Sequence, residues 1–150
     1  MIVDTSAIVA MLRAESDAAA LSKVLRGAAV LRLSAASYVE LAVVIDGLGD
    51  PVLSGGLDAV LTAYRIRIEP LTENQARIAR AAYQRFGRGS GHPARLNMGD
   101  CFAYATARDL DEPLLFKGND FKLTDIEIVT EPIKRHRLSE VLAGYEVGAS

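Results

Sequence analysis

The sequence predicts an α/β domain with a mainly parallel central sheet. Short apolar runs alternate with longer segments in which apolar residues recur every three or four positions. Strands that alternate with helices are typical of a parallel sheet covered by helices. Half of the 150 residues are hydrophobic, which is enough for one well-buried core and too little for two. We therefore expect a single domain over residues 1–150, with a core at about 1–130 and a C-terminal extension.

Apolar runs and helix-capping signals locate the individual elements. Strands are expected at residues 2–3, 30–33, 66–68, 114–116 and 128–129. Helices are expected at residues 6–12, 18–25, 35–45, 57–64, 73–86 and 98–110. Thr72 and Gln75 have the spacing of a capping box at the start of the fifth helix. The buried stripe of that helix is expected to be Ala79, Ala82, Tyr83 and Phe86.

Cysteine usage and hydropathy exclude several classes of protein. Cys101 is the only cysteine, so the sequence provides neither an internal disulfide nor a cysteine-rich zinc site. Glu40 interrupts the most apolar stretch before it is long enough to cross a bilayer. The chain also opens without the basic and apolar parts of a signal peptide. We therefore expect a cytoplasmic protein with no membrane partner.

The charge of the chain is unevenly distributed. The net charge is −2, but residues 74–99 contain no acid and carry +5, so the remainder carries −7. A second basic cluster covers residues 134–137. Such a segment is either an ordinary solvated surface or a contact surface for a polyanion such as RNA. The candidate RNA-binding residues in the first segment are Arg77, Arg80, Arg88 and Arg95.

Four carboxylates lie in otherwise uncharged surroundings. Asp4 directly follows the first expected strand, and Glu40 is the one charge in residues 33–45. Asp100 lies in the first turn of the last helix, and Asp120 follows the strand at 114–116. The carboxyl ends of parallel strands meet at one edge of a sheet, so Asp4 and Asp120 are expected to share a crevice. Clustered carboxylates are stabilised in their ionised form by a divalent cation, and hard oxygen ligands favour Mg²⁺ or Mn²⁺.

Each acid also has a purely local explanation, which stays open at this point. Asp4 has the position of a helix cap, and Asp120 lies in a turn-like Gly-Asn-Asp segment. Ser37 and Glu40 have capping-box spacing, as do Asn97 and Asp100 in a looser form. Ser34 is an equally good cap for the third helix, which would place Glu40 beyond capping reach.

These residues resemble the motifs of the PIN domains, and in particular of the VapC toxins of bacterial VapBC toxin–antitoxin systems. The four matching segments, in order, are Val3-Asp4-Thr5-Ser6-Ala7, Ser37-Tyr38-Val39-Glu40, Asn97-Met98-Gly99-Asp100-Cys101 and Gly118-Asn119-Asp120-Phe121. Many members of the family carry Thr or Ser shortly before the fourth acid, where this chain has Lys117-Gly118.

The resemblance implies a three-layer α/β/α domain that hydrolyses RNA phosphodiester bonds with one or two magnesium ions and metal-activated water. It implies Asp4 and Asp100 as the main metal ligands, with Glu40 and Asp120 completing the catalytic and metal-binding set. Ser6 would order the site by a hydrogen bond. It further implies a VapB-like antitoxin, a homodimer and a toxin–antitoxin hetero-oligomer.

Two other classes of function are compatible with parts of the pattern. A haloacid-dehalogenase-like phosphatase also has an Asp after its first strand and uses magnesium, but it needs a second Asp where this chain has Ser6. A catalytically silent RNA- or antitoxin-binding module would be favoured by loss of one of the four acids, and all four are present.

Overall fold

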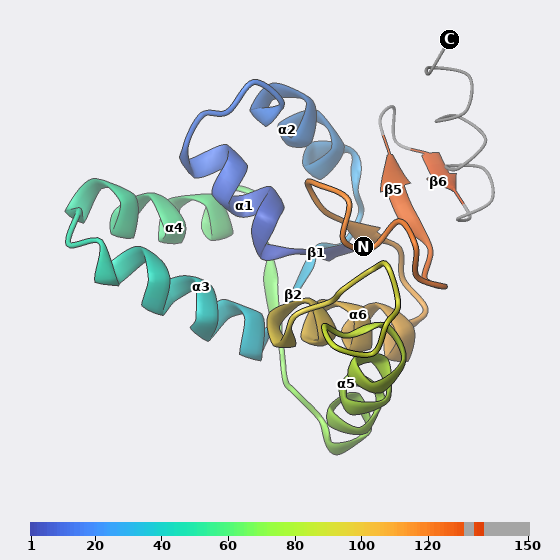
Figure 1. Ribbon diagram of the computed structural model, residues 1–150. Coiled ribbons are helices and arrows are strands. Elements are labelled where there is room, and N and C mark those ends of the chain that lie inside the picture. The colour runs from blue at the N-terminus through green and yellow to red at the C-terminus, as the bar shows by residue number, and fades with distance from the viewer. Residues whose placement is uncertain (131–133, 137–150) are drawn as a thin grey trace, which may run out of the picture.

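A computed structural model describes residues 1–130 and 134–136, with backbone alone for 130 and 134–136 (Figure 1). The strands are β1 (Ile2–Val3), β2 (Arg32–Ser34), β3 (Arg67–Glu69), β4 (Leu114–Leu115), β5 (Ile128–Thr130) and β6 (Lys134–His136). The helices are α1 (Thr5–Leu12), α2 (Ala18–Gly27), α3 (Ala35–Gly47), α4 (Pro51–Ala63), α5 (Glu73–Phe86) and α6 (Met98–Leu110).

The sheet has the strand order β3-β2-β1-β4-β5-β6. The first five strands are parallel, and β6 pairs antiparallel with β5. From β1 the chain passes through α1 and α2 to β2, and from β3 it passes through α5 and α6 to β4 on the other side of β1. The order of connection therefore reverses between β1 and β4, and in open α/β sheets such a reversal opens a crevice at the carboxyl ends of the strands.

Helices cover both faces of the sheet, because successive strand residues point to opposite sides. Ile2, Leu114 and Ile128 pack in one buried cluster with residues of α5 and α6. Their neighbours Val3, Leu115 and Val129 pack in a second cluster with residues of α1, α2, α3 and α4. This arrangement confirms the predicted three-layer α/β/α architecture (Figure 1).

Several expectations for single elements are corrected by the structure. Helix α4 begins at Pro51, well before the predicted start, because Asp50 accepts a hydrogen bond from the Val52 backbone N–H and caps it. Tyr83 was expected in the buried stripe of α5 but is 44% exposed. Residues 134–136 of the basic cluster form β6, while the rest of the expected C-terminal extension lies outside the described residues.

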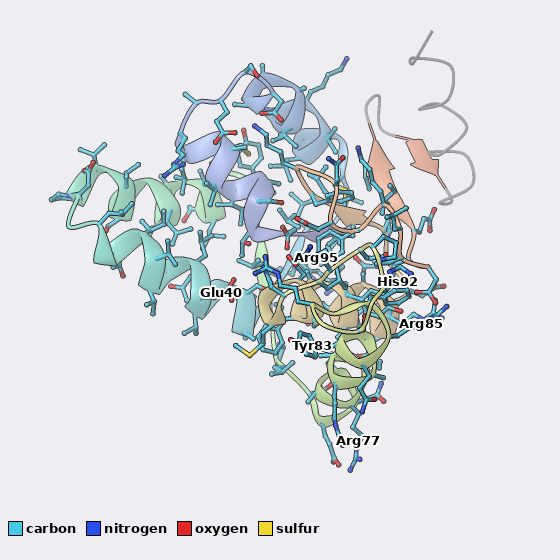
Figure 2. All side chains as sticks on the ribbon, viewed as in Figure 1. Glu40, Arg77, Tyr83, Arg85, His92 and Arg95 are labelled. Carbon is cyan, nitrogen blue, oxygen red and sulfur yellow. The ribbon has the colours of Figure 1, made fainter. Side chains whose placement is uncertain are left out.

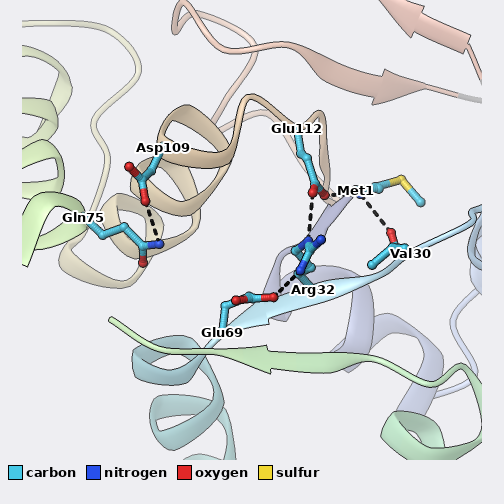
Figure 3. A network of polar contacts seen from close by, with 7 residues as sticks. All are labelled: Met1, Val30, Arg32, Glu69, Gln75, Asp109 and Glu112. Carbon is cyan, nitrogen blue, oxygen red and sulfur yellow. Dashed lines mark hydrogen bonds and ion pairs between the residues drawn. The ribbon is translucent and has the colours of Figure 1, made fainter. Parts of the chain in front are cut away.

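Ion pairs and hydrogen bonds connect elements that are distant in sequence (Figure 3). Arg32 of β2 pairs with Glu69 of β3 and, at 2.8 Å, with Glu112 in the turn before β4. Gln75 of α5 donates from Nε2 to Oδ2 of Asp109 of α6 at 3.0 Å. These contacts fix β2 and β3 against β4 and α5 against α6. In the described part of the chain, no helix has the length and apolarity needed to cross a membrane.

Candidate active site

Asp4 lies at the carboxyl end of β1, where the connections reverse, and only 5% of it is exposed. Its Oδ2 accepts hydrogen bonds from the Ser6 backbone N–H at 3.0 Å and from Ser6 Oγ at 2.5 Å. The hydrogen bond from the Ser6 backbone N–H caps α1, so Asp4 does serve as a helix cap, as its local explanation states. Burial nevertheless raises the pKa of Asp4, because the Ser6 hydrogen bonds do not fully offset the loss of water.

Ser6 connects Asp4 to the end of β4. Its Oγ accepts a hydrogen bond from the Lys117 backbone N–H at 3.0 Å, so the same hydroxyl donates to Asp4 and receives from Lys117. The Lys117 ammonium pairs with Glu15, and with Asp17 at 3.1 Å, in the segment between α1 and α2. The sequence predicted Ser6 as a residue of the site but did not predict Lys117. Lys117 contributes a backbone N–H, which does not depend on the side chain, so the residue type gives no signal.

Asp100 is the third residue of α6 and forms a capping box with Asn97. The Asn97 side chain accepts from the Asp100 backbone N–H, and Asp100 Oδ2 accepts from the Asn97 backbone N–H, both at 2.8 Å. Burial raises the pKa of Asp100 to about 6. The Asn97 hydrogen bond and the charge of Arg88 lower it, whereas the charges of Asp4 and Asp120 raise it. The capping box therefore fixes the position of Asp100, whose pKa depends on the charges of Asp4 and Asp120.

Asp120 is the exposed member of the group. Its negative charge raises the pKa of both Asp4 and Asp100, which places it at the same crevice. Phe121 anchors the segment, since it is buried and packs edge-on against Phe116 with ring centroids 5.1 Å apart. The structure thus places Asp4, Asp100 and Asp120 close enough for their charges to act on one another.

Glu40 approaches this group from α3. Ser34 is the N-cap residue of α3, which leaves Glu40 beyond capping reach and removes its local explanation. The Glu40 carboxylate lies against Gly99 of α6, next to Asp100 in the chain (Figure 2). A Cβ atom placed on Gly99 would lie 2.6 Å from Glu40 Oε2. Gly99 is a residue of the site that sequence reasoning passed over.

Residues 1–127 match the model of the PIN domain family. Ribonuclease VapC28 of Mycobacterium tuberculosis is 59% identical over 127 residues, which cover 85% of this chain and 96% of the relative. This chain belongs to the VapC family of PIN-domain ribonucleases. The family match decides against the phosphatase alternative.

Further relatives agree with this family. Ribonuclease VapC of Mycolicibacterium smegmatis is 44% identical over 132 residues, covering 86% of this chain and 99% of the relative. The crystal structure of Mycobacterium tuberculosis VapC20, described as a Sarcin-Ricin loop cleaving toxin, has a TM-score of 0.65. That alignment covers 89% of this chain and 98% of the other at 14% identity, so it shows the fold alone.

Divalent metal ions are a general requirement of VapC-family PIN domains, and the acids here suit such an ion. Among the described residues, no three His, Cys, Asp or Glu side chains converge as a ready-made metal cage. Mg²⁺ is usually held by one or two carboxylates and keeps several waters, so such a cage is not needed. A cation between Asp4 and Asp100 would offset the burial and mutual repulsion that raise their pKa values.

The basic loop at residues 87–96 borders the acids of this VapC-family site. The Arg88 N–H donates to the Leu96 carbonyl at 3.0 Å, and the Leu96 N–H donates to the Phe86 carbonyl at 2.9 Å, which closes the loop at its base. His92 packs edge-on against Phe86, with ring centroids 4.9 Å apart. Arg88 and Arg95 are exposed on this loop, whereas Arg77 pairs with Glu73 on α5, far from Glu40 (Figure 2).

The raised pKa of Asp100 predicts how the stability of the metal-free protein depends on pH. Because the folded state holds this proton more tightly than the unfolded chain, Asp100 adds stability below its ordinary pKa of 3.8. That contribution is lost as the pH rises to about 6. We expect the melting temperature of the metal-free wild type, relative to that of Asp100→Asn, to fall between pH 4 and pH 6.5. A constant difference across this range would contradict the assignment.

Proposed function

We propose that this VapC-family enzyme is a magnesium-dependent endoribonuclease toxin whose cation is held mainly by Asp4 and Asp100. The observation that carries the proposal is the burial of the Asp4 carboxylate beside two further acids at the carboxyl edge of the sheet. An isolated carboxylate in such surroundings costs several kcal/mol or more, roughly, unless a cation or hydrogen bonds compensate it. Hard oxygen ligands favour Mg²⁺, with Mn²⁺ as the substitute.

The remaining residues of the site act around this cation. A bound divalent ion lowers the pKa of water and neutralises charge on a scissile phosphate. Glu40, whose carboxylate lies against Gly99, would orient the attacking water or hold the ion through water. Asp120 is exposed and completes the acidic group toward the substrate. Ser6 fixes Asp4 in place through its two hydrogen bonds.

Arg88 and Arg95 are the proposed contacts to the RNA backbone. Both are exposed on the loop at residues 87–96, and the charge of Arg88 is close enough to lower the pKa of Asp100. An acidic crevice repels phosphates, so attraction must come from basic residues at its border. Arg77 forms an exposed ion pair with Glu73, and Arg77 and Arg80 on the exposed face of α5 stay predictions.

Mapping the cleaved RNA tests the activity. The chain is expressed without an antitoxin, and the 5′ ends of the cellular RNA fragments are sequenced. We expect discrete new ends that are absent when Asp4→Asn is expressed to the same level. The same RNA ends in the wild-type and Asp4→Asn samples would contradict the proposed ribonuclease activity.

An antitoxin is the proposed regulator of the enzyme. The VapC name of the relatives and the fold similarity to a toxin–antitoxin complex from Klebsiella pneumoniae (TM-score 0.59, 17% identity, 80% of this chain and 88% of the other) favour such a partner. In addition, α3 and α4 present large apolar side chains to solvent. The most exposed are Val52 at 80%, Val43 at 66%, and Val39 and Val44 at 57% each, and Leu48 directly after α3 is 55% exposed. Uncovered apolar patches mark protein interfaces, so we place the antitoxin on this surface, in an assembly with dimeric toxin.

Capture of the antitoxin checks this surface. Tagged Asp4→Asn protein is purified from its own organism and is expected to bring down a small protein that abolishes wild-type cleavage at a one-to-one ratio. Val43→Asp combined with Val52→Asp should prevent the capture, because each places a charge in an apolar interface. Thr62→Asp, an exposed change on α4, is the control and should retain it. Recovery of free, fully active toxin alone would contradict the proposal.

A further inference from the structure

Gly99 lies under the Glu40 carboxylate at the start of α6. It is the second residue of the helix and is buried. A Cβ atom on Gly99 would lie 2.6 Å from Glu40 Oε2 and 2.9 Å from Glu40 Cδ, and closer still to Oε1. Its backbone is not in the left-handed region that favours glycine, so chain conformation does not explain this residue. The close approach of Glu40 does.

We propose that Gly99 is a positioning residue for the catalytic site, since its lack of a side chain admits the Glu40 carboxylate at the start of α6, one residue before Asp100 in the chain. The inference rests on the function proposed above for Glu40. The first turn of a helix carries a partial positive charge, which favours a carboxylate placed against it. Gly99 therefore leaves space for the Glu40 carboxylate at the positive end of α6. This space exists only when position 99 has no Cβ.

The two sides of this contact differ in how easily they move. Glu40 is exposed on α3, and its carboxylate is the far end of a flexible side chain. The first turn of α6 is held by the Asn97–Asp100 capping box and by the Cys101 N–H, which donates to the Asn97 carbonyl at 3.2 Å. A methyl group at position 99 will consequently displace Glu40 and leave the helix in place.

Because Glu40 moves more easily than the first turn of α6, a methyl group at position 99 should lower activity without lowering stability. Gly99→Ala should reduce RNA cleavage by about 10- to 100-fold, the range typical of groups that support a metal site. Its melting temperature without metal should be unchanged or slightly higher, because alanine favours the helix. Gly55→Ala is the matched control: it lies inside α4, and its added Cβ would meet nothing within 4 Å. That variant should keep full activity.

A double-mutant cycle with Glu40→Ala tests whether Gly99 acts through Glu40. Cleavage of total bacterial RNA and the affinity for Mn²⁺ are measured for the wild type, both single variants and the double variant. We expect Gly99→Ala to cause no further loss once Glu40 has been truncated. Equal losses in both backgrounds would overturn the inference. Full activity of Glu40→Ala would instead reject the role proposed for Glu40, and with it the catalytic importance of Gly99.

The crystal structure of metal-free Gly99→Ala provides a readout that does not depend on activity. We expect the Glu40 carboxylate to leave its position while Asn97 and Asp100 keep their reciprocal hydrogen bonds. A shifted first turn of α6 with Glu40 still in place would overturn the inference and leave the proposed ribonuclease function intact.

Discussion

Asp4→Asn is expected to lower RNA cleavage by at least about 100-fold, the upper end of the effect of residues that only support metal ligands. The substitution keeps the shape of the side chain and its capping of α1, because Asn caps helices as well as Asp does. It removes the charge that a divalent ion would bind. Since burial raises the pKa of Asp4, the neutral amide should also make the metal-free protein equally or more stable at neutral pH.

Cleavage rates and metal-free melting temperatures are measured for Asp4→Asn beside Asp58→Asn, which removes one exposed carboxylate from α4. The control should keep its activity. A large fall in the melting temperature of Asp4→Asn would show that Asp4 serves mainly the fold, and wild-type cleavage by this variant would show that its charge is not needed.

Arg88→Ala combined with Arg95→Ala is expected to weaken RNA binding on the order of tenfold at low salt. Each lost phosphate contact should reduce the slope of log affinity against log salt by about 0.7 for single-stranded RNA. Phosphate contacts position the substrate without reading its sequence, so the weakening should be similar for different RNAs. Affinity for Mn²⁺ should stay unchanged, because neither arginine is a metal ligand.

Salt titrations of inactive Asp4→Asn protein with and without the two substitutions decide this prediction. Lys23→Ala combined with Arg26→Ala removes the same charge from the exposed surface of α2 and should leave the slope unchanged. Arg77→Ala combined with Arg80→Ala tests the outer face of α5. If only this last pair changes the slope, the RNA lies along α5 and the loop at residues 87–96 is not its contact surface.

Local signals in the sequence were sufficient where side chains close in sequence define an element. Helices α5 and α6 have the predicted bounds, and they begin where predicted because Thr72 caps α5 and the Asn97–Asp100 capping box starts α6. Helix α4 was predicted too short, since Gly55 and Gly56 lower the helix propensity of its first half. Tertiary packing compensates there: a Cβ on Gly56 would lie 3.2 Å from Leu12, so the small residue allows α1 to pack closely.

The site shows the same division between local and tertiary information. The carboxyl ends of parallel strands share an edge, so the proximity of Asp4 and Asp120 could be predicted from strand order alone. The contact between Glu40 and Gly99 joins two helices that are distant in sequence, and no local pattern encodes how they pack. The ion pairs of Lys117 with Glu15 and Asp17 also depend on tertiary structure.

Metal dependence is the most direct test of the central claim that Asp4 and Asp100 hold a divalent ion for RNA hydrolysis. Purified protein is freed of metal with EDTA, and Mg²⁺ or Mn²⁺ is titrated back while cation binding and RNA cleavage are followed in the same samples. We predict that cleavage stops in EDTA and returns with the bound ion in the wild type, and that Asp4→Asn and Asp100→Asn lose both binding and cleavage. Cleavage by the wild type that persists in EDTA would contradict the account.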